Sequence, residues 1–407
     1  MRMLILSQYY PPETGAPQNR LHELALRLQK RGMEVSVLTA MPNYPKMEIF
    51  EGYRDKRFVR ENIDGIEVYR SRIFVKKSSS IFLRLLNYFS FTWTSFWTGL
   101  RKVPDFDVIM VESPPLFLGM SAYALARRKN ARMIFNVSDL WPESAEKLGL
   151  VTNKFFLKMA TWLEEFLYRK ADLITGQTMG IVENIKGRFP EKKVYWLPNG
   201  VDLTNFDPSK IDSNWRSENG IAEEELVLLY AGIIGHAQGL GLILKAASQL
   251  KDVPVRFVLV GDGPVKPELL KLKKELSVDN VTFFDPVTKT EIPQIVKAAD
   301  AAIIPLKKLP LFEGAIPSKI FENLAMKTPI ILGVDGEARG LFIEEGQAGV
   351  FFEPENVDDL VAAVRDILRD RSSLKEMGEN GRKYVELKFN RNTIAESFAQ
   401  EVTSLRS

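Results

Sequence analysis

Short apolar runs alternate with segments of helical periodicity along nearly the whole chain. The first run, Met3 to Ser7, leads through a loop rich in Pro and Gly into an amphipathic segment that stops at Gly32, a residue type that often ends a helix. Strand, loop and helix in this order form the repeating unit of a parallel α/β sheet. Further strand signals of this first sheet lie at 33–40, 107–113, 131–138 and 172–178.

The regular pattern breaks at 197–208, where Pro, Asn-Gly and Asp-Pro favour turns and a connection between domains. The same alternation then resumes and predicts a second parallel sheet. After Val357 only helical patterns follow, and the last one has an apolar stripe that must cover another part of the protein. The strand signals of the second sheet lie at 225–232, 255–261, 281–285, 301–306 and 328–333.

These patterns predict two doubly wound α/β domains. We expect the first to comprise residues 1–200 together with a C-terminal helix, 391–407, that crosses back onto it. The second would comprise residues 201–390. Because ligands of such sheets bind at the carboxyl ends of the strands, we expect the site in a cleft between the domains.

Composition narrows the class of protein. With 407 residues, 45% of them apolar and 26% charged, the chain is typical of a packed globular protein with more than one core. A net charge of +3 does not indicate a nucleic-acid partner. The chain has no Cys, which excludes disulfides, and only two His, His22 and His236, for which we expect structural roles rather than a metal site. The N-terminus lacks the pattern of a signal peptide, so we expect a cytoplasmic protein.

Two glycine-rich turns follow strands of the second sheet, at 230–241 and 260–264. Backbone N–H groups in such turns can face an anion such as a diphosphate, although a tight turn without a ligand explains the glycines equally well. Neither turn matches the dinucleotide fingerprint or a P-loop.

A sharper signal lies at 316–333. Pro317 and Ser318 can start a helix there, with Lys319 in its first turn and Glu322 one turn on. Lys319 suits a phosphate, and a carboxylate at Glu322 could accept hydrogen bonds from ribose hydroxyls. The alternative is a surface pair of Lys and Glu, which is common on helices.

Residues 81–100 predict an aromatic helix. Phe89, Trp93 and Trp97 belong to one apolar face, whereas Asn87 and Thr94 mark the other. Basic residues flank the segment, as expected of a helix in an anionic membrane interface. The alternative is a helix that packs its apolar stripe against the first sheet.

Several segments, in their order along the chain, resemble those of known glycosyltransferases. Over nearly its whole length the chain resembles a retaining glycosyltransferase of the GT-B fold, family 4, and within it the WbuB-like subgroup that builds O-antigen, colanic acid and capsule polysaccharides. The resemblance implies two Rossmann-like domains facing across a cleft, with the nucleotide sugar mainly on the C-terminal domain. The segments are YYPPETGAPQNRLHELALRLQKRGMEVSVLTAMPNYP, DLWPES, LPNGVD, AGIIGHAQGL, VGDGP, IPSKIFENLA and GEARGLFIEEGQAGVFFEPENVDDL.

The resemblance assigns a donor site. Glu322 matches the second Glu of the family's E-x7-E motif, which holds the ribose, whereas Gly314 stands at the first position with Glu313 displaced by one residue. Ile233 and Gln238 stand where relatives commonly place Arg and Lys, so we choose Lys319 as the cation that stabilises the leaving diphosphate. Our donor-binding candidates are Gly15, Gly232, Gly235, Gln238, Gly263, Val287, Ile316, Pro317, Ser318, Lys319 and Glu322.

The acceptor side is assigned in the N-terminal domain. Ser138 stands where many relatives have His, and Asp139 follows it at a strand end. We expect Asp139 to be catalytic together with Lys319 and Glu322, although Asp139 could instead cap the next helix. Glu143 is its weaker companion.

The resemblance implies sugar transfer with retention of configuration and without metal, cofactor or enzymic nucleophile. We expect a UDP-linked donor, with an N-acetylated deoxyhexosamine such as N-acetylfucosamine as the sugar. The expected acceptor is a polyprenyl-diphosphate-linked saccharide at the inner face of the plasma membrane, reached through peripheral contact of residues 81–100. Two alternatives remain: a sugar-nucleotide epimerase or synthase on the same fold, and a non-catalytic nucleotide-sugar-binding subunit, because the first motif Glu and the usual Arg and Lys are absent.

Overall fold

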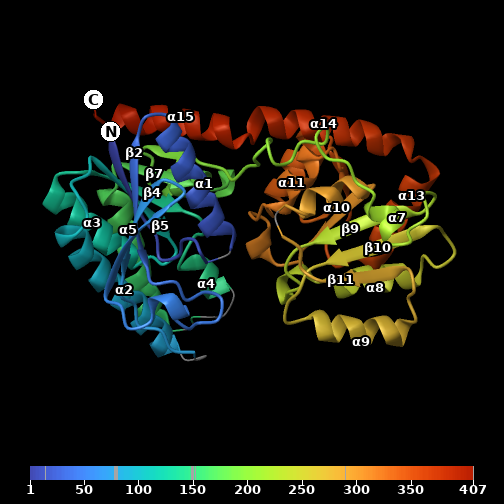
Figure 1. Ribbon diagram of the computed structural model, residues 1–407, viewed down its shortest axis with the longest axis horizontal. Coiled ribbons are helices and arrows are strands. Elements are labelled where there is room, and N and C mark those ends of the chain that lie inside the picture. The colour runs from blue at the N-terminus through green and yellow to red at the C-terminus, as the bar shows by residue number, and fades with distance from the viewer. Residues whose placement is uncertain (14, 78–80, 148–150, 152, 289, 407) are drawn as a thin grey trace. The chain divides into compact units, whose positions relative to one another are not determined.

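The computed structural model describes the chain apart from residues 14, 78–80, 148–150, 152, 289 and 407 (Figure 1). The chain divides into two compact units. Unit 1 comprises Met1–Asn199 and Asn392–Ser407, and unit 2 comprises Gly200–Arg391. Each unit contains one twisted sheet flanked by helices, so the α/β class predicted from the sequence is confirmed.

Unit 1 has an eight-stranded sheet in the order β3-β4-β2-β1-β5-β6-β7-β8. The central strands are almost wholly buried, which explains why they appear in the sequence as continuous apolar runs. The strands are β1 (Arg2–Leu6), β2 (Glu34–Ala40), β3 (Phe58–Ile63), β4 (Ile66–Ser71), β5 (Val108–Ser113), β6 (Arg132–Val137), β7 (Leu173–Gly176) and β8 (Val194–Trp196).

One edge of this sheet differs from the prediction of a purely parallel sheet. β3 runs antiparallel to β4, and the two strands form a hairpin around Asp64 and Gly65, both of which have positive φ. An Asp-Gly pair between two strand-like runs is a strong hairpin signal, and our sequence analysis missed it. β8 was missed as well, because three residues carry little periodicity.

Helices cover both faces of the first sheet. α2, α3, α5 and α6 pack on one face, and α1 and α15 pack on the other. The helices of unit 1 are α1 (Ala16–Lys30), α2 (Ile81–Arg101), α3 (Leu118–Lys129), α4 (Glu143–Lys147), α5 (Lys154–Lys170), α6 (Met179–Arg188) and α15 (Arg391–Thr403).

The C-terminal helix completes the core of unit 1, as predicted. Its apolar stripe, Ala395, Phe398 and Val402, is fully buried against β1, β2 and α1. Arg27 on α1 donates to the Asn392 side chain at 3.0 Å, which fixes the start of the helix. Figure 1 shows α15 beside α1, although the two helices come from opposite ends of the chain.

Helix α2 forms where it was predicted, but two of its aromatic residues face outward and two of its polar residues face inward. Asn87 and Ser95, both polar, face inward and are buried, whereas Phe89 and Trp93 are exposed. Asn87 accepts a hydrogen bond from Gln8 at 2.8 Å and donates to the Phe74 carbonyl at 2.7 Å. The alternative in which the apolar stripe packs on the sheet is therefore wrong for these two aromatic residues. In the part of the chain that the structure describes, no helix has the length and apolar character needed to cross a membrane.

Unit 2 has a six-stranded parallel sheet in the order β11-β10-β9-β12-β13-β14. Its strands are β9 (Leu226–Ala231), β10 (Val255–Val260), β11 (Val281–Phe284), β12 (Ala301–Pro305), β13 (Ile330–Gly333) and β14 (Gly349–Phe351). Helices α8, α9 and α13 bury one face and α10 packs on the other. The helices are α7 (Trp215–Glu218), α8 (Gly241–Ser248), α9 (Lys266–Leu276), α10 (Ile292–Ala298), α11 (Lys319–Ala325), α12 (Glu337–Arg339), α13 (Val357–Arg369) and α14 (Ser372–Lys388).

Candidate functional site

The two glycine turns of unit 2 lie against each other, backbone on backbone. They follow the neighbouring strands β9 and β10, and Ile234 N–H donates to the Asp262 carbonyl at 2.9 Å. A Cβ atom at Gly261 would lie 2.0 Å from the Gly232 carbonyl oxygen, and one at Gly263 would lie 2.3 Å from that of Ile234. The glycines are thus required by close packing, and the paired turns form a narrow floor at the carboxyl end of the sheet.

Lys319 joins this floor. It is the first residue of α11, as predicted, and its Nζ lies 3.7 Å from the centroid of the Tyr230 ring. A Cβ atom at Gly232 would lie 3.1 Å from the same Nζ, so the ammonium group contacts the first glycine turn directly. The structure thus brings together Gly232 and Lys319, two residues that are 87 positions apart in the sequence.

The surroundings of Lys319 change its acidity. Burial lowers the pKa of the Lys319 ammonium to about 7, and the carboxylate of Glu322 opposes this shift only in part. Tyr230 beneath it is also buried, which raises the pKa of its phenol, and its hydroxyl donates to the Ile233 carbonyl at 2.6 Å. An anion bound next to Lys319 would stabilise the protonated ammonium and raise its pKa again. The site therefore favours a ligand such as a diphosphate.

The remaining donor candidates belong to α11, to the segment before it and to the first glycine turn. Glu322 is in the first turn of α11 and half-buried. The side chain of Gln238 folds over Gly235, since a Cβ there would lie 2.8 Å from its Oε1. Ile316, Pro317 and Ser318 form the half-buried approach to α11, and Ser318 takes the capping position without a side-chain hydrogen bond.

Val287 belongs to a different connection of the second sheet. It is in the connection between β11 and α10, and its side chain is exposed. Ile233 is also exposed, to 67%, at the position where the resemblance expects a cation. None of the described contacts joins Val287 to Lys319.

Glu313, the acidic residue displaced by one position from the first Glu of the E-x7-E motif, lies in the turn before α11. The Glu313 side chain is exposed, and its carbonyl accepts from Glu337 N–H at 2.8 Å. At Gly314 a Cβ atom would meet nothing within 4 Å. The position of the expected first carboxylate is therefore open space, and Glu313 is anchored through its backbone.

In unit 1, Ser138 belongs to a buried polar network at the carboxyl ends of β5, β6 and β7. Arg20 from α1 donates to Glu112, Ser138 and Gln177, each at 2.7 Å. Glu112 also accepts from Ser138 and Asn136. The Ser138 hydroxyl thus donates one hydrogen bond and accepts another within the network, which links the strand ends.

Asp139 follows this network and is half-buried. Its Oδ2 accepts from the Ser144 hydroxyl at 2.9 Å, and burial raises the pKa of the carboxyl group. Because α4 begins at Glu143, Asp139 bonds to the first turn of that helix without standing at its capping position. Asp139 therefore supports the helix through the Ser144 side chain and does not cap it, and its role toward the acceptor stays a prediction. Glu143 is the first residue of α4 and is half-buried.

Gly15 precedes α1 in a loop with strong anchors. Glu13 accepts from the backbone N–H groups of Asn43 and Tyr44 at 2.7 and 2.8 Å, and the fully buried Arg70 donates to the Pro11 carbonyl. A Cβ atom at Gly15 would lie 2.4 Å from Gln18 Oε1. Pro11 and Glu13 are thus anchored, whereas at Gly15 itself only the tip of the Gln18 side chain would crowd a Cβ atom.

Sequence reasoning missed Arg20, Glu112, Asn136 and Gln177. A signal was present, because Glu112 and Asn136 are polar residues near the ends of otherwise apolar strands, where a side chain can reach the carboxyl edge of a sheet. His22 is structural as expected: Tyr10 and Asp64 contact its two ring nitrogens at 2.8 and 2.9 Å. Among the described residues, no three His, Asp or Glu side chains form a group able to hold a metal ion.

Comparison with known proteins identifies the family. The family model "Glycosyl transferase 4-like domain" matches residues 15–200, and "Glycosyl transferases group 1" matches residues 212–384. The glycosyl transferase of colanic acid biosynthesis named WcaI, from Escherichia coli K12, is 26% identical over 419 positions that cover 99% of this chain and 100% of the relative. The O-antigen chain mannosyltransferase C of Escherichia coli is 21% identical over 410 positions, covering 100% and 99% of the two chains.

Solved structures agree on the fold. HepE from Anabaena, determined in complex with UDP-glucose, superimposes with a TM-score of 0.72 at 18% identity, covering 99% of this chain and 100% of HepE. The two matched domains follow each other in the order and at the positions of the two α/β units. The chain therefore belongs to the family 4 glycosyltransferases of the GT-B fold.

Proposed function

We propose that the protein transfers a sugar from a UDP-linked donor to a saccharide on a polyprenyl diphosphate carrier, as a step in the assembly of a bacterial surface polysaccharide. The observation that carries the donor site is the contact of the Lys319 ammonium with the glycine turn at Gly232. The complex of HepE with UDP-glucose and the polysaccharide pathways named for WcaI and the mannosyltransferase support the choice of donor and product.

In the proposed reaction, the bond between the anomeric carbon and the donor phosphate oxygen breaks. The acceptor hydroxyl forms the new glycosidic bond on the same face of the sugar, and its proton passes to the departing phosphate oxygen, which yields UDP. Lys319 would neutralise the charge that develops on the diphosphate, in the place of a metal ion, and Glu322 would accept hydrogen bonds from the ribose. Asp139 would contact the acceptor.

We place this reaction at the inner face of the membrane, with peripheral contact through the exposed side of α2. Trp93 is 66% exposed and Phe89 is exposed beside it, in a helix whose buried side is partly polar. Aromatic side chains of this kind favour the interface between headgroups and acyl chains.

The first test is binding. Thermal unfolding would be followed with UDP, GDP, dTDP and NAD under identical conditions, since saturation at a hundred times the dissociation constant stabilises a protein by about 2.7 kcal/mol. We expect a selective response to UDP that is lost in Lys319→Ala and kept in Lys245→Ala, an exposed lysine of α8. A response that survives Lys319→Ala and Glu322→Ala together would contradict the site.

The second test is transfer. A panel of UDP-sugars that includes N-acetylated deoxyhexosamines would be incubated with and without lipid-linked saccharide. We expect release of UDP only with acceptor and an α-linked product from an α-linked donor. An epimerase would convert the donor without acceptor, and a non-catalytic subunit would bind UDP without releasing it from any donor. Inversion at the anomeric carbon would contradict the proposed mechanism.

A further inference from the structure

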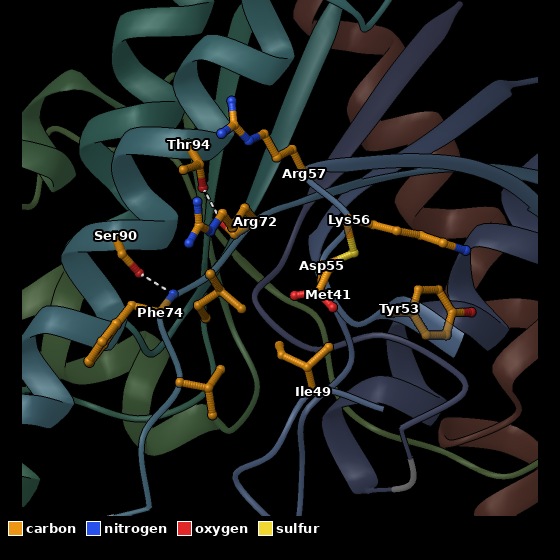
Figure 2. Close-up of a pocket in the computed structure, with 12 residues that line it drawn as sticks. Met41, Ile49, Tyr53, Asp55, Lys56, Arg57, Arg72, Phe74, Ser90 and Thr94 are labelled. Carbon is orange, nitrogen blue, oxygen red and sulfur yellow. Dashed lines mark hydrogen bonds between the residues drawn. The ribbon is translucent and has the colours of Figure 1, made fainter. Parts of the chain in front are cut away.

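Unit 1 contains a pocket that plays no part in the site described above. It has a volume of about 670 Å³ and lies between the connection from β2 to β3, the residues that follow β4, and α2 (Figure 2). Its floor is apolar, with Met41, Ile49 and Ile73, and α2 contributes Ser90 and Thr94 to one wall. The pocket is large enough for the headgroup of a small amphiphile.

Positive charge predominates in the pocket lining. Lys56, Arg57 and Arg72 oppose a single carboxylate, Asp55. In Figure 2, the guanidinium groups of Arg57 and Arg72 lie beside Thr94, and Lys56 points away from them. The Arg72 N–H donates to the Arg57 carbonyl at 3.2 Å, so the backbones that carry this pair are fixed relative to each other.

The two arginines have no carboxylate partner among the described residues. Within the described residues neither Arg57 nor Arg72 forms an ion pair, although most other arginines of unit 1 do, such as Arg20, Arg60 and Arg70. The Thr94 hydroxyl donates to the Arg72 carbonyl at 2.5 Å and the Ser90 hydroxyl accepts from Phe74 N–H at 2.8 Å. Lys56 has no ion pair among the described residues either, so its ammonium group and the two guanidinium groups are left for a ligand, and the geometry of the guanidinium groups suits a phosphate.

An exposed apolar face begins at the edge of this pocket. Phe74 lines the pocket and is 41% exposed, and Trp93 lies about 60° around α2 from Ser90 in an ideal helix. Beneath the surface, Phe89 packs on the buried Phe117, and Phe117 contacts Phe156 of α5, at 4.4 and 6.5 Å between ring centroids. Met120 of α3 and Trp162 of α5 add further exposed apolar side chains. We define the apolar face as Phe74, Leu86, Phe89, Trp93, Met120, Phe155, Met159 and Trp162, all of them exposed.

We propose that the pocket holds the phosphate headgroup of an anionic phospholipid while the apolar face lies in the membrane interface. Bound phosphate would pair with Arg57 and Arg72, and the apolar floor would accommodate the glycerol and first acyl carbons. Anionic lipid is the occupant that matches both features, unpaired arginines and a rim of Trp, Phe and Met. This inference deepens the membrane contact proposed above and rests on it.

The test is cosedimentation of the full chain with vesicles of phosphatidylcholine alone or mixed with phosphatidylglycerol. We expect binding mainly to the mixed vesicles, and a loss of roughly thirtyfold in Arg57→Gln with Arg72→Gln. The matched control, Lys30→Gln with Lys186→Gln, removes the same charge at exposed sites on α1 and α6 and should change binding less than about twofold. Unchanged thermal unfolding verifies that each variant folds.

A charge-preserving variant distinguishes specific binding of the phosphate in the pocket from nonspecific electrostatic attraction to the membrane. Arg57→Lys with Arg72→Lys keeps the charge but removes the paired donors, and we expect it to lose most of the preference for phosphatidylglycerol. If it binds like the unaltered protein, the pocket is overturned and only surface charge remains. Trp93→Glu should weaken binding to both vesicle types.

Two further measurements distinguish a lipid from a soluble phosphate and the lipid pocket from the donor site. Calorimetry with inorganic phosphate tests a soluble source, and binding of phosphate by the arginine pair without any binding to vesicles would overturn the lipid proposal. The thermal response to UDP is measured in every variant and should stay unchanged. If UDP has no effect even on the unaltered protein while vesicle binding depends on the arginines, the proposed donor site fails and the lipid pocket stands.

Discussion

At the scale of single residues, Lys319 decides how donor binding depends on pH. Its pKa of about 7 in the free protein is the result of burial, with Tyr230 beneath the ammonium and Glu322 one turn on. A bound diphosphate stabilises the protonated form, so binding takes up a proton above pH 7. Affinity for UDP-glucose, whose phosphates do not titrate in this range, should be constant below pH 7 and weaken up to about thirtyfold by pH 8.5.

Substitutions at the same position make this prediction specific. Lys319→Arg should bind with little change between these pH values, because guanidinium stays charged. Lys319→Met should bind weakly at all pH values without loss of thermal stability, since it removes the cost of burying an ammonium group. Calorimetric titrations would contradict the assignment if Lys319→Arg kept the full pH dependence.

Gly261 is the residue on which the floor of the site depends. It has a φ of 144° and leaves no room for a Cβ beside the Gly232 carbonyl. We expect Gly261→Ala to lower the free energy of unfolding of unit 2 by about 3 kcal/mol and to abolish the response to UDP. Gly314→Ala, where a Cβ meets open space, should change stability by less than about 0.5 kcal/mol. Urea unfolding followed by circular dichroism measures both.

At the scale of elements, α2 buries a side of mixed polarity, because Phe91 is fully buried and Phe96 packs against the core, but the polar Asn87 is buried as well. Its buried Asn87 pairs with Gln8 and with the Phe74 carbonyl, whereas Trp93 is mostly exposed. Asn87→Leu should therefore destabilise unit 1 by about 2 kcal/mol, because it removes the hydrogen bonds of Asn87 to the Gln8 amide and to the Phe74 carbonyl. The Gln8 amide would keep only its bond to the Tyr9 hydroxyl. Trp93→Gln should cost less than about 0.5 kcal/mol. Chemical denaturation of the two variants checks this, and the opposite order would show that α2 packs through Trp93 rather than through Asn87.

The sequence predicted the elements better than their orientations. Long apolar strands and the C-terminal helix were found from periodicity alone, because the central strands are buried on both faces and the helix buries one continuous stripe. The rotation of α2 was not predictable, since it depends on Gln8 and Phe74, which are remote in the sequence. The hairpin at Asp64 has a local signal in the sequence, the Asp-Gly pair between two strand-like runs. By contrast, β8 and β14 have three residues each and give almost no signal.

The same limit applies to the candidate site. Lys319 and the glycines were selected as separate motifs, and their mutual contact follows only from the order of β9, β10 and β12 in the sheet. The network of Arg20 and Glu112 joins α1 to β5 across 92 residues, and no local pattern specifies such a pairing. Site residues thus become recognisable in sequence where one motif holds them, and not where distant segments share a hydrogen bond.

At the scale of the whole molecule, the two units should respond to different perturbations. Phe398 is fully buried in unit 1, so Phe398→Ala should destabilise that unit by about 3–5 kcal/mol. UDP should stabilise unit 2 alone, because Lys319 and both glycine turns belong to it. Calorimetric scans would show two transitions, one lowered by the substitution and the other raised by the nucleotide. A single transition that both treatments move would show that the units unfold together.

The return of α15 to unit 1 also has a consequence for biosynthesis. Ala395, Phe398 and Val402 are translated after the whole of unit 2, yet the core around β1 and α1 is incomplete without them. At about 5–20 residues per second, the roughly 200 residues after unit 1's first segment take about 10–40 s to translate. During that time unit 2 can fold while the first-made half of the protein still exposes an unfilled apolar groove. Unit 1 is begun before unit 2 and completed after it, so in the cell it is the part that needs protection from aggregation.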